Sequence, residues 1–386
     1  MSTTAPNPSG QGTNPLKALL AYGQSPWMDY IRRDLLTSGR LKKMIEEDGL
    51  RGMTSNPTIF EKAITGSKDY ADILESPEVK NLDAKAVFEK IAIRDVQDAT
   101  DIFKPVYQET KRRDGYVSLE VSPILAGDTQ ATIDEARRLW KGVGRGNVMI
   151  KVPGTVEGLP AIRQLLEEGI NINITLLFAQ SRYEEVAELF LQALEARVSK
   201  GQDIAHIASV ASFFVSRIDT LVDSTVDSML KTERDANKRA LLTSLQGKVA
   251  IANAKLTYKK YQELYSSPRW KTLAAKGAQT QRLLWASTST KNPKYRDVMY
   301  VEELIGPDTV DTVPPATFDA FRDHGKVRKS LTENVDEAAK IMANLQKAGI
   351  SMKEVTDKLV VDGVRLFADA FAQLLEATGR TAGVRA

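Results

Sequence analysis

Several features are missing from this 386-residue sequence, and each absence excludes a class of protein. Cysteine does not occur, which excludes disulfides and thiolate metal sites and fits a reducing compartment. The two histidines, His206 and His324, are too few for a typical zinc site. The segment around His324 is rich in charged residues, as exposed segments usually are, which argues against a histidine–serine catalytic pair. We therefore expect no metal site.

Long apolar runs and blocks of one charge are also lacking. No stretch of about 18 apolar residues occurs, so no segment is expected to span a membrane. The 53 basic and 50 acidic residues are spread along the chain, which indicates neither nucleic acid nor a membrane surface as a partner. The motifs GxGxxG, GxxxxGK[ST] and HExxH are absent. The composition predicts an ordinary cytoplasmic protein.

The first fifteen residues differ in composition from the remainder. They are polar, are rich in proline, glycine, serine and threonine, and contain no apolar segment of the kind found in signal peptides. We expect residues 1–15 to form a disordered leader and residues 16–386 to form one domain.

Eight short apolar runs follow the leader and alternate with longer amphipathic stretches. The runs predict strands within residues 25–31, 50–57, 116–123, 147–154, 172–178, 207–217, 282–289 and 308–315. Helical patterns occupy residues 132–143, 156–169 and 181–201 between them. This is the count of a (β/α)8 TIM barrel of the α/β class, although an open doubly wound sheet shows the same alternation.

Two regions exceed a minimal barrel. Residues 222–280 form a charged helical tract about twice the length of an ordinary crossover helix. Residues 330–379 carry further helices after the eighth strand, and residues 355–377 show a clear 3.6-residue period. We interpret both regions as additions to one barrel, because no linker separates a second domain.

Polar side chains lie within the predicted strands or just past them. Because active sites of such barrels lie at the C-terminal ends of the strands, these groups should converge on one cavity. They are Asp29, Asn56, Glu120, Lys151, Asn173, Thr175, Ser212, Arg217 and Ser287.

Lys151 is the most unusual of them, because it interrupts the apolar run "VMIKV". Burial disfavours the charged form of a lysine, and the neutral amine forms Schiff bases with carbonyl compounds. The alternative is a lysine paired with a carboxylate or reaching the rim of the barrel. Glu120 on the preceding strand fits both, as an ion-pair partner or as a group that moves protons through water.

The other polar residues also have two interpretations each. Asp29 could remove a hydroxyl proton, or it could cap a helix or pair with Arg32 or Arg33. Asn56 precedes a proline, so turn formation is a strong alternative to binding. Arg217 could clamp a phosphate or join a surface ion pair.

Four segments together resemble one family. "MTSNPTIF" (53–60), "VSLEV" (117–121), the stretch from Asn147 to Phe178 and "SFFVSRID" (212–219) look like signature segments of transaldolases, in the same order. The resemblance runs from about Trp27 to residues 311–317. The length and the added helices resemble the longer bacterial form of the family.

The resemblance implies a role for each matching residue. Lys151 matches the Schiff-base lysine, Asp29 the acid/base aspartate, and Glu120 the glutamate that works through a water held with Thr175. The substrate-binding set implied by the match is Asn56, Asn173 and Ser212 around the dihydroxyacetone hydroxyls, with Arg217 and Ser287 as phosphate anchors. Compact transaldolases have a second phosphate arginine after the seventh strand, and Lys291 is its expected substitute here.

The implied reaction moves a dihydroxyacetone unit from sedoheptulose 7-phosphate to glyceraldehyde 3-phosphate and gives erythrose 4-phosphate and fructose 6-phosphate. The family does this in the non-oxidative pentose phosphate pathway, without a metal or organic cofactor. Sugar phosphates are the expected partners, and the protein should be a monomer or a homodimer. The alternatives are a fructose 6-phosphate aldolase, which Phe214 argues against because such aldolases have tyrosine there, and a non-catalytic sugar-phosphate sensor.

Overall fold

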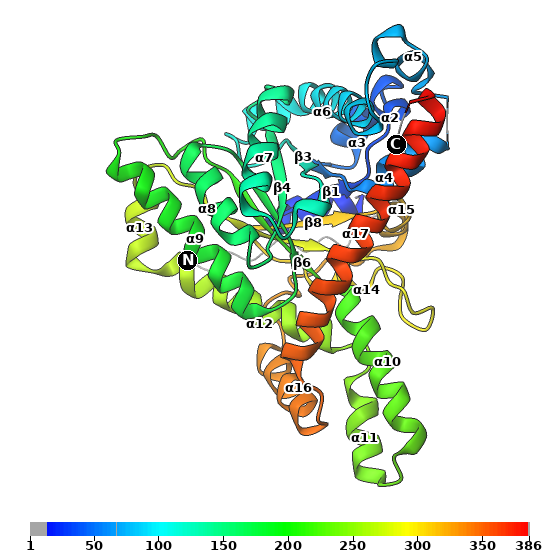
Figure 1. The fold of residues 1–386 in the computed structure, drawn as a ribbon. Coiled ribbons are helices and arrows are strands. Elements are labelled where there is room, and N and C mark those ends of the chain that lie inside the picture. The colour runs from blue at the N-terminus through cyan, green and yellow to red at the C-terminus, as the bar shows by residue number, and fades with distance from the viewer. Residues whose placement is uncertain (1–13, 67, 385–386) are drawn as a thin grey trace.

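The eight predicted strands are present and close into a parallel barrel (Figure 1). The computed structural model describes residues 14–66 and 68–384. Each strand pairs with the next in the chain, and the last pairs with the first. The strands are β1 (Gln24–Asp29), β2 (Gly52–Thr54), β3 (Tyr116–Glu120), β4 (Val148–Pro153), β5 (Ile172–Leu177), β6 (Ser209–Phe214), β7 (Arg282–Ala286) and β8 (Thr309–Val313). The predicted TIM barrel is confirmed, and the open sheet is excluded.

The strands form because their sequences suit burial on both faces. β4, β5 and β6 are buried at every position and are built mainly from aliphatic and aromatic residues. The few polar side chains in them therefore point into the barrel or pair with a neighbour. This arrangement brings polar residues of different strands together at one end of the barrel.

Helices lie on the outside of the barrel, most of them between successive strands. They are α2 (Arg33–Thr37), α3 (Arg40–Glu47), α4 (Pro57–Thr65), α5 (Ala71–Leu74), α6 (Ala84–Glu109), α7 (Thr129–Val143), α8 (Gly158–Glu168), α9 (Gln180–Ser199), α14 (Met299–Glu303) and α15 (Pro315–His324), with the short 3-10 helices η2 (Pro77–Val79) and η3 (Pro123–Leu125). The helices predicted at 132–143, 156–169 and 181–201 correspond to α7, α8 and α9.

The chain enters the barrel through α1 (Pro15–Ala18) and η1 (Leu19–Tyr22). The side chain of Asn14 caps α1 by accepting a hydrogen bond from the backbone N–H of Leu16 at 3.0 Å. Of the leader predicted at residues 1–15, residues 1–13 lie outside the described part of the chain.

The tract predicted at 222–280 is divided into separate helices. They are α10 (Ser216–Thr232), α11 (Ala236–Leu245), α12 (Val249–Ser266) and α13 (Pro268–Ala274). Each break has a local cause. Asp235 caps α11 by accepting from the N–H of Lys238, Gly247 adopts a φ of +67° before α12, and Ser267 caps α13 ahead of Pro268. The charged composition indicated helix correctly, but these caps and turns divide it.

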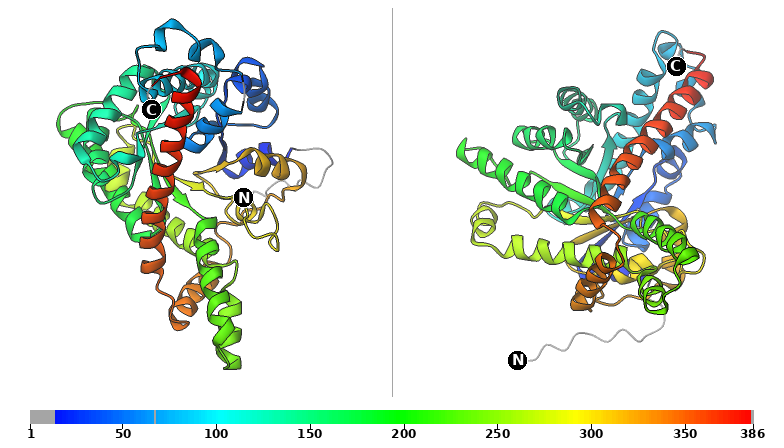
Figure 2. Two further views of the ribbon diagram at one scale, coloured as in Figure 1. Left: turned by 45° about the vertical axis from the view of Figure 1, so that its right-hand side comes forward. Right: turned by 60° about the horizontal axis from the view of Figure 1, so that its bottom comes forward.

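The C-terminal addition consists of α16 (Val335–Lys347) and α17 (Met352–Ala382). α16 packs on α12, whereas α17 contacts α4, α6, α10 and β5. Figures 1 and 2 show α17 (red) as one long helix that runs from α16 across the barrel to α4 and α5. No helix in the described part of the chain is long and apolar enough to cross a membrane.

A buried ionic cluster closes the opposite, N-terminal end of the barrel. Arg282 at the start of β7 donates to Asp114 Oδ1 at 2.8 Å and to Ser25 Oγ at 2.7 Å. Asp114 also accepts from Ser25 Oγ at 2.8 Å and from Trp27 Nε1 at 3.2 Å. Burial alone would raise the pKa of Asp114, but Arg282 and these hydrogen bonds hold that pKa below its ordinary value. This end of a TIM barrel serves stability.

Asp114→Ala is therefore expected to lower the free energy of unfolding by about 3–5 kcal/mol, because it leaves the Arg282 charge buried without its partner. The side chains of Arg282 and Asp114 are only 4% and 9% exposed. Asp101→Ala is the matched control, since it breaks the exposed pair with Arg145 and should change stability by less than about 1 kcal/mol. Denaturant unfolding measures both variants, and losses of equal size would contradict a stabilising role for the cluster.

Candidate active site

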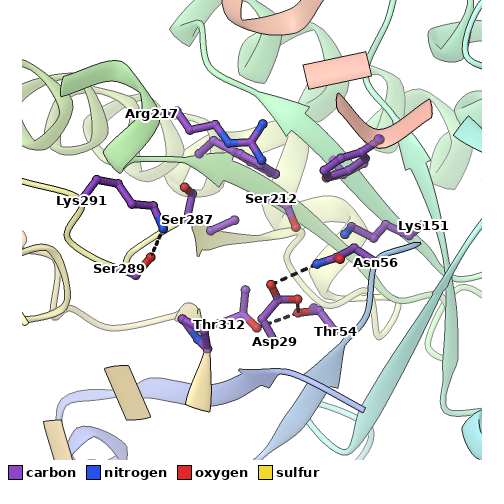
Figure 3. A pocket seen from close by; sticks show the side chains of 15 residues that line it. Asp29, Thr54, Asn56, Lys151, Ser212, Arg217, Ser287, Ser289, Lys291 and Thr312 are labelled. Carbon is purple, nitrogen blue, oxygen red and sulfur yellow. Dashed lines mark hydrogen bonds between the residues drawn. The ribbon is translucent and has the colours of Figure 1, made fainter. Parts of the chain in front are cut away.

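The C-terminal ends of the strands enclose a cavity of about 200 Å³ (Figure 3). Most of the predicted site residues line it, namely Asp29, Asn56, Lys151, Thr175, Ser212, Phe214, Arg217, Ser287 and Lys291. Glu120 and Asn173 lie just outside the lining, and each contacts a residue in it. The strand ends therefore bring the predicted set together around one space.

Lys151 projects from the middle of β4, and only 5% of its surface is exposed. Its Nζ donates a hydrogen bond to the carbonyl oxygen of Ser55 at 3.1 Å and lies 3.4 Å from Oε2 of Glu120. Glu120 and Lys151 are register partners on the neighbouring strands β3 and β4. The predicted proximity of the two side chains is thus present, and the amine also faces the cavity.

The Glu120 carboxyl is suited to exchanging protons near neutral pH. Burial raises its pKa to about 7, although the neighbouring Lys151 works in the opposite direction. The Thr175 hydroxyl, on the cavity wall, is buried and has no hydrogen-bond partner among residues 14–66 and 68–384. A polar atom left in this way can bind a water or a substrate hydroxyl.

Asp29, the last residue of β1, faces the same space. Its Oδ1 accepts a hydrogen bond from Thr54 Oγ1 at 2.7 Å, and its Oδ2 accepts a longer one from Asn56 Nδ2 at 3.4 Å (Figure 3). Burial raises the pKa of Asp29, while Lys151 and Thr54 oppose that shift. A carboxylate with a raised pKa is a stronger base than one in water.

The alternatives considered for Asp29 do not apply in this structure. Arg32 and Arg33, its nearest arginines in sequence, instead pair with carboxylates elsewhere, Arg32 with Asp69 and Arg33 with Asp95. Asp29 forms part of the strand and caps no helix. Its position is explained by the cavity rather than by a surface contact.

For Asn56 both interpretations hold at once. Its Oδ1 accepts from the backbone N–H of Ile59 at 3.1 Å and so caps α4, which begins at Pro57. Its Nδ2 remains free to face the cavity and donate to Asp29. The cap fixes the orientation of the amide, so the turn residue also presents a donor to the site.

Asn173 and Ser212 form a buried polar chain beneath the cavity. Ser212 Oγ donates to Asn173 Oδ1 at 2.6 Å, and Asn173 Nδ2 donates to Ser118 Oγ at 3.0 Å. Asn173 is fully buried, so these bonds account for the amide that the sequence places inside a strand. Ser212 connects this chain to the cavity wall.

The other end of the cavity is cationic. Figure 3 shows Arg217 and Lys291 at the end away from Lys151. Burial, opposed by Asp29, lowers the pKa of Arg217, and burial together with the charge of Arg217 lowers the pKa of Lys291. Within the described residues neither side chain forms an ion pair, and Lys291 Nζ donates only to Ser289 Oγ at 2.6 Å. Two neighbouring cations without a carboxylate partner are suited to binding an anion such as phosphate.

Ser287 lies between the two segments that carry these cations, just after β7 and against Ser216, the residue before Arg217. It adopts a left-handed backbone with φ +55°, and its Oγ lies 3.0 Å from Oγ of Ser216, at the start of α10. A non-glycine residue in this conformation is uncommon and often marks a functional site. The strained turn carries the chain from β7 into the segment that holds Lys291.

Comparison with known proteins agrees with this geometry. The family model described as transaldolase/fructose-6-phosphate aldolase matches residues 26–378. This chain belongs to that family. The chain is similar to the transaldolase of Trichodesmium erythraeum, which is 49% identical over 94% of this chain and 96% of its own length. Transaldolase 2 of Nostoc punctiforme is 49% identical over the same shares of the two chains, and the transaldolase of a Parafrankia species is 45% identical over 94% of this chain and 97% of its own.

These relatives confirm the predicted family and the predicted transaldolase type of transferase. The family match begins close to Trp27, where the resemblance seen in the sequence also begins. It extends beyond residues 311–317, where that resemblance ends, and includes most of α17. The C-terminal helix is therefore part of the family fold.

Several residues of the cavity were missed by the sequence-based prediction. Thr54, Ser289, Thr312 and Phe367 line it. Thr54 and Thr312 end or nearly end their strands, and their hydroxyls lie 2.8 Å apart, so the strand-end rule could have found them. Phe367 belongs to α17 and carries no such signal.

The described part of the chain contains no cluster of side chains that could bind a metal ion. Among residues 14–66 and 68–384, no three histidine, aspartate or glutamate side chains are grouped closely enough to hold a metal ion. The expectation that the reaction needs no cofactor stays a prediction.

Proposed function

We propose that the cavity transfers a dihydroxyacetone unit between sugar phosphates through a Schiff base on Lys151. The observation that carries the proposal is the buried amine of Lys151, which has two carboxyl groups with raised pKa values near it, those of Asp29 and Glu120. The same cavity also holds two cations, Arg217 and Lys291, that form no ion pair within the described residues. A ketose phosphate has a carbonyl group near one end and a phosphate at the other, and the amine and the two cations lie in the same order along the cavity. Its carbonyl end meets Lys151, and its phosphate meets Arg217 and Lys291.

Schiff-base formation is the first step. The neutral amine of Lys151 attacks the C2 carbonyl of the ketose, and a proton moves to the carbonyl oxygen to give a carbinolamine. Loss of water then gives the iminium ion. Glu120, whose pKa is about 7, supplies and removes these protons through a water that also contacts the Thr175 hydroxyl.

Carbon–carbon cleavage follows. The Asp29 carboxylate removes the proton of the C4 hydroxyl, the C3–C4 bond breaks, and its electron pair moves into the iminium to form an enamine. The aldose phosphate leaves as an aldehyde. Asn173 and Ser212 hold the hydroxyls of the remaining three-carbon unit through their polar chain. The reverse steps with a second aldehyde complete the transfer.

The phosphate end selects the substrate class. Arg217 offers a planar set of donors, and Lys291 adds a mobile point charge in the place where compact transaldolases have arginine. We assign Ser287 to the same end because it lines the cavity, contacts Ser216 beside Arg217 and precedes the segment that holds Lys291. Phe214, whose ring centroid lies 5.2 Å from Cζ of Arg217, holds that guanidinium in place.

Borohydride trapping tests the assignment of the nucleophile. The protein is incubated with fructose 6-phosphate, reduced with borohydride and digested, and the labelled peptide is identified by mass spectrometry. The label is expected on Lys151 and not on Lys291, the other lysine of the cavity. A protein that binds the sugar phosphate but leaves Lys151 unlabelled would be a sensor rather than a Schiff-base enzyme.

The cellular setting is also a proposal. We place the enzyme in the cytoplasm because a chain without cysteine fits a reducing compartment. The pathway is the non-oxidative pentose phosphate pathway, which follows from transaldolase chemistry. A monomer or a homodimer is the expected form.

A further inference from the structure

The inner face of α17 contributes Phe367 to the lining of the cavity, although the helix follows the last strand by some forty residues. Leu359, Gly363, Phe367 and Phe371 recur at a spacing of four residues, and all are buried. This spacing places them in one stripe along the helix. The stripe is the side of α17 that packs against β5, α4 and α6.

Gly363 lets the helix approach the strand ends closely. A Cβ at this position would lie 2.9 Å from Cδ2 of Leu176 and 3.7 Å from Nη1 of Arg217. Leu176 follows Thr175 on β5 and itself has a left-handed backbone with φ +60°, at the point where the pairing of β5 with β6 shifts register. The helix therefore packs on the irregular end of β5, next to Thr175 and Arg217 of the site.

Phe371, two turns beyond Gly363, anchors the helix further along the same stripe. Its ring packs edge-on against Phe88 of α6, with ring centroids 5.9 Å apart, and Phe88 packs in the same way against Phe60 of α4. Between the contact at Gly363 and this aromatic cluster, the position of Phe367 is fixed. Its ring is held by the helix and does not depend on a loop.

Phe367 lies across the cavity from one functional end to the other. Its ring centroid is 5.6 Å from Nζ of Lys151 and 5.8 Å from Cζ of Arg217. The side chain lines the cavity, and the residue is only 9% exposed. One apolar ring thus covers both the nitrogen that carries the substrate and the cation assigned to its phosphate.

We propose that Phe367 is a positioning residue that keeps water away from the covalent intermediate and so directs it to transfer rather than hydrolysis. This inference rests on the proposed function, because it concerns the fate of the enamine on Lys151. The enamine must survive while one aldehyde leaves and another arrives. During that interval the phosphate of the donor no longer fills the space beside Arg217, and the ring remains as a fixed cover.

The competing reaction is hydrolysis. The enamine takes up a proton at C3 and becomes an iminium ion, and water adds to C2 with loss of a proton. The resulting carbinolamine breaks its C2–N bond and releases free dihydroxyacetone and the Lys151 amine. Hydrolysis therefore depends on a water molecule reaching C2 of the iminium ion. A ring close to Nζ hinders that approach without taking part in the bond changes.

The experiment measures how the intermediate divides between the two fates. Fructose 6-phosphate and erythrose 4-phosphate are supplied together, and free dihydroxyacetone and sedoheptulose 7-phosphate are quantified in the same reaction. Phe367→Ala is expected to raise the ratio of released to transferred unit at least about tenfold, because water then reaches C2 of the intermediate more easily. Phe367→Leu, which keeps most of the apolar cover, should give a value between Phe367→Ala and wild type.

Leu366→Ala is the matched control, because Leu366 is the adjacent residue of α17 and is 50% exposed. It should leave the ratio at the wild-type value. A ratio in Phe367→Leu and in folded Phe367→Ala that equals wild type, with only a lowered melting temperature, would show that the ring merely supports the fold. Should Phe367→Ala fail to fold, Phe367→Leu alone decides. Wild-type protein that neither traps nor transfers would instead overturn the proposed function.

Discussion

Replacing Lys151 with methionine is expected to lower kcat for dihydroxyacetone transfer on the order of 10⁶-fold, the loss seen when a covalent nucleophile is removed from an enzyme. Lys291, the other lysine that lines the cavity, should not take over, because it lies at the cationic end beside Ser289. Borohydride should then trap nothing. Coupled assays of transfer to erythrose 4-phosphate measure the loss directly.

Methionine suits this substitution because it keeps the length and apolar stem of lysine. The change removes the partner of Glu120, whose pKa is already raised to about 7 and rises further once Lys151 is gone. Glu120 therefore becomes neutral at pH 7, and the core avoids a buried unpaired charge. The melting temperature should stay near that of wild type. Folded Lys151→Met that retained more than a thousandth of the activity would place the Schiff base on another residue.

Lys291→Met separates chemistry from phosphate binding. It removes one of two cations at the anion end, so KM for sugar phosphates should rise while the Schiff base still forms on Lys151. Loss of trapping in both variants would mean that the two lysines cannot be assigned separate roles.

The barrel was predictable because its strands carry a strong signal. β4 and β5 are buried along their whole length, and the polar residues that form the site interrupt their apolar runs. Once the strands close in chain order, Asp29, Glu120 and Lys151 must come together at one end. The division of residues 216–274 into α10, α11, α12 and α13 depended on single caps such as Asp235 and on the turn at Gly247, which a helical composition does not reveal.

The contribution of α17 to the cavity could not be predicted from the same rules. The 3.6-residue period at residues 355–377 predicts a helix with one apolar face, but it does not say which surface covers that face. Gly363 and Phe367 acquire their meaning from contacts with Leu176, Lys151 and Arg217, which are distant in sequence. Asn56 shows the opposite case, because the sequence offered turn formation and binding as alternatives, whereas its amide both caps α4 and faces the cavity.

Asp29→Asn is expected to slow carbon–carbon cleavage by about 10²- to 10⁴-fold, the usual contribution of a positioned general base. The amide keeps the volume of the carboxylate, and its oxygen can still accept the hydrogen bond from Thr54, so the site should stay folded. It cannot accept the C4 hydroxyl proton. Schiff-base formation does not need that proton transfer and should remain close to wild type.

Single-turnover experiments with fructose 6-phosphate separate the two steps. Borohydride added at short times measures the Schiff base, and the appearance of glyceraldehyde 3-phosphate measures cleavage. The expected signature is a trapped six-carbon adduct that accumulates on Lys151, because the iminium forms but does not fragment. Equal loss of trapping and of cleavage would instead mean that Asp29 supports the cavity through Thr54 and Asn56. In wild type the cleavage rate should fall as the pH drops through the raised pKa of Asp29, since only the carboxylate form acts as a base.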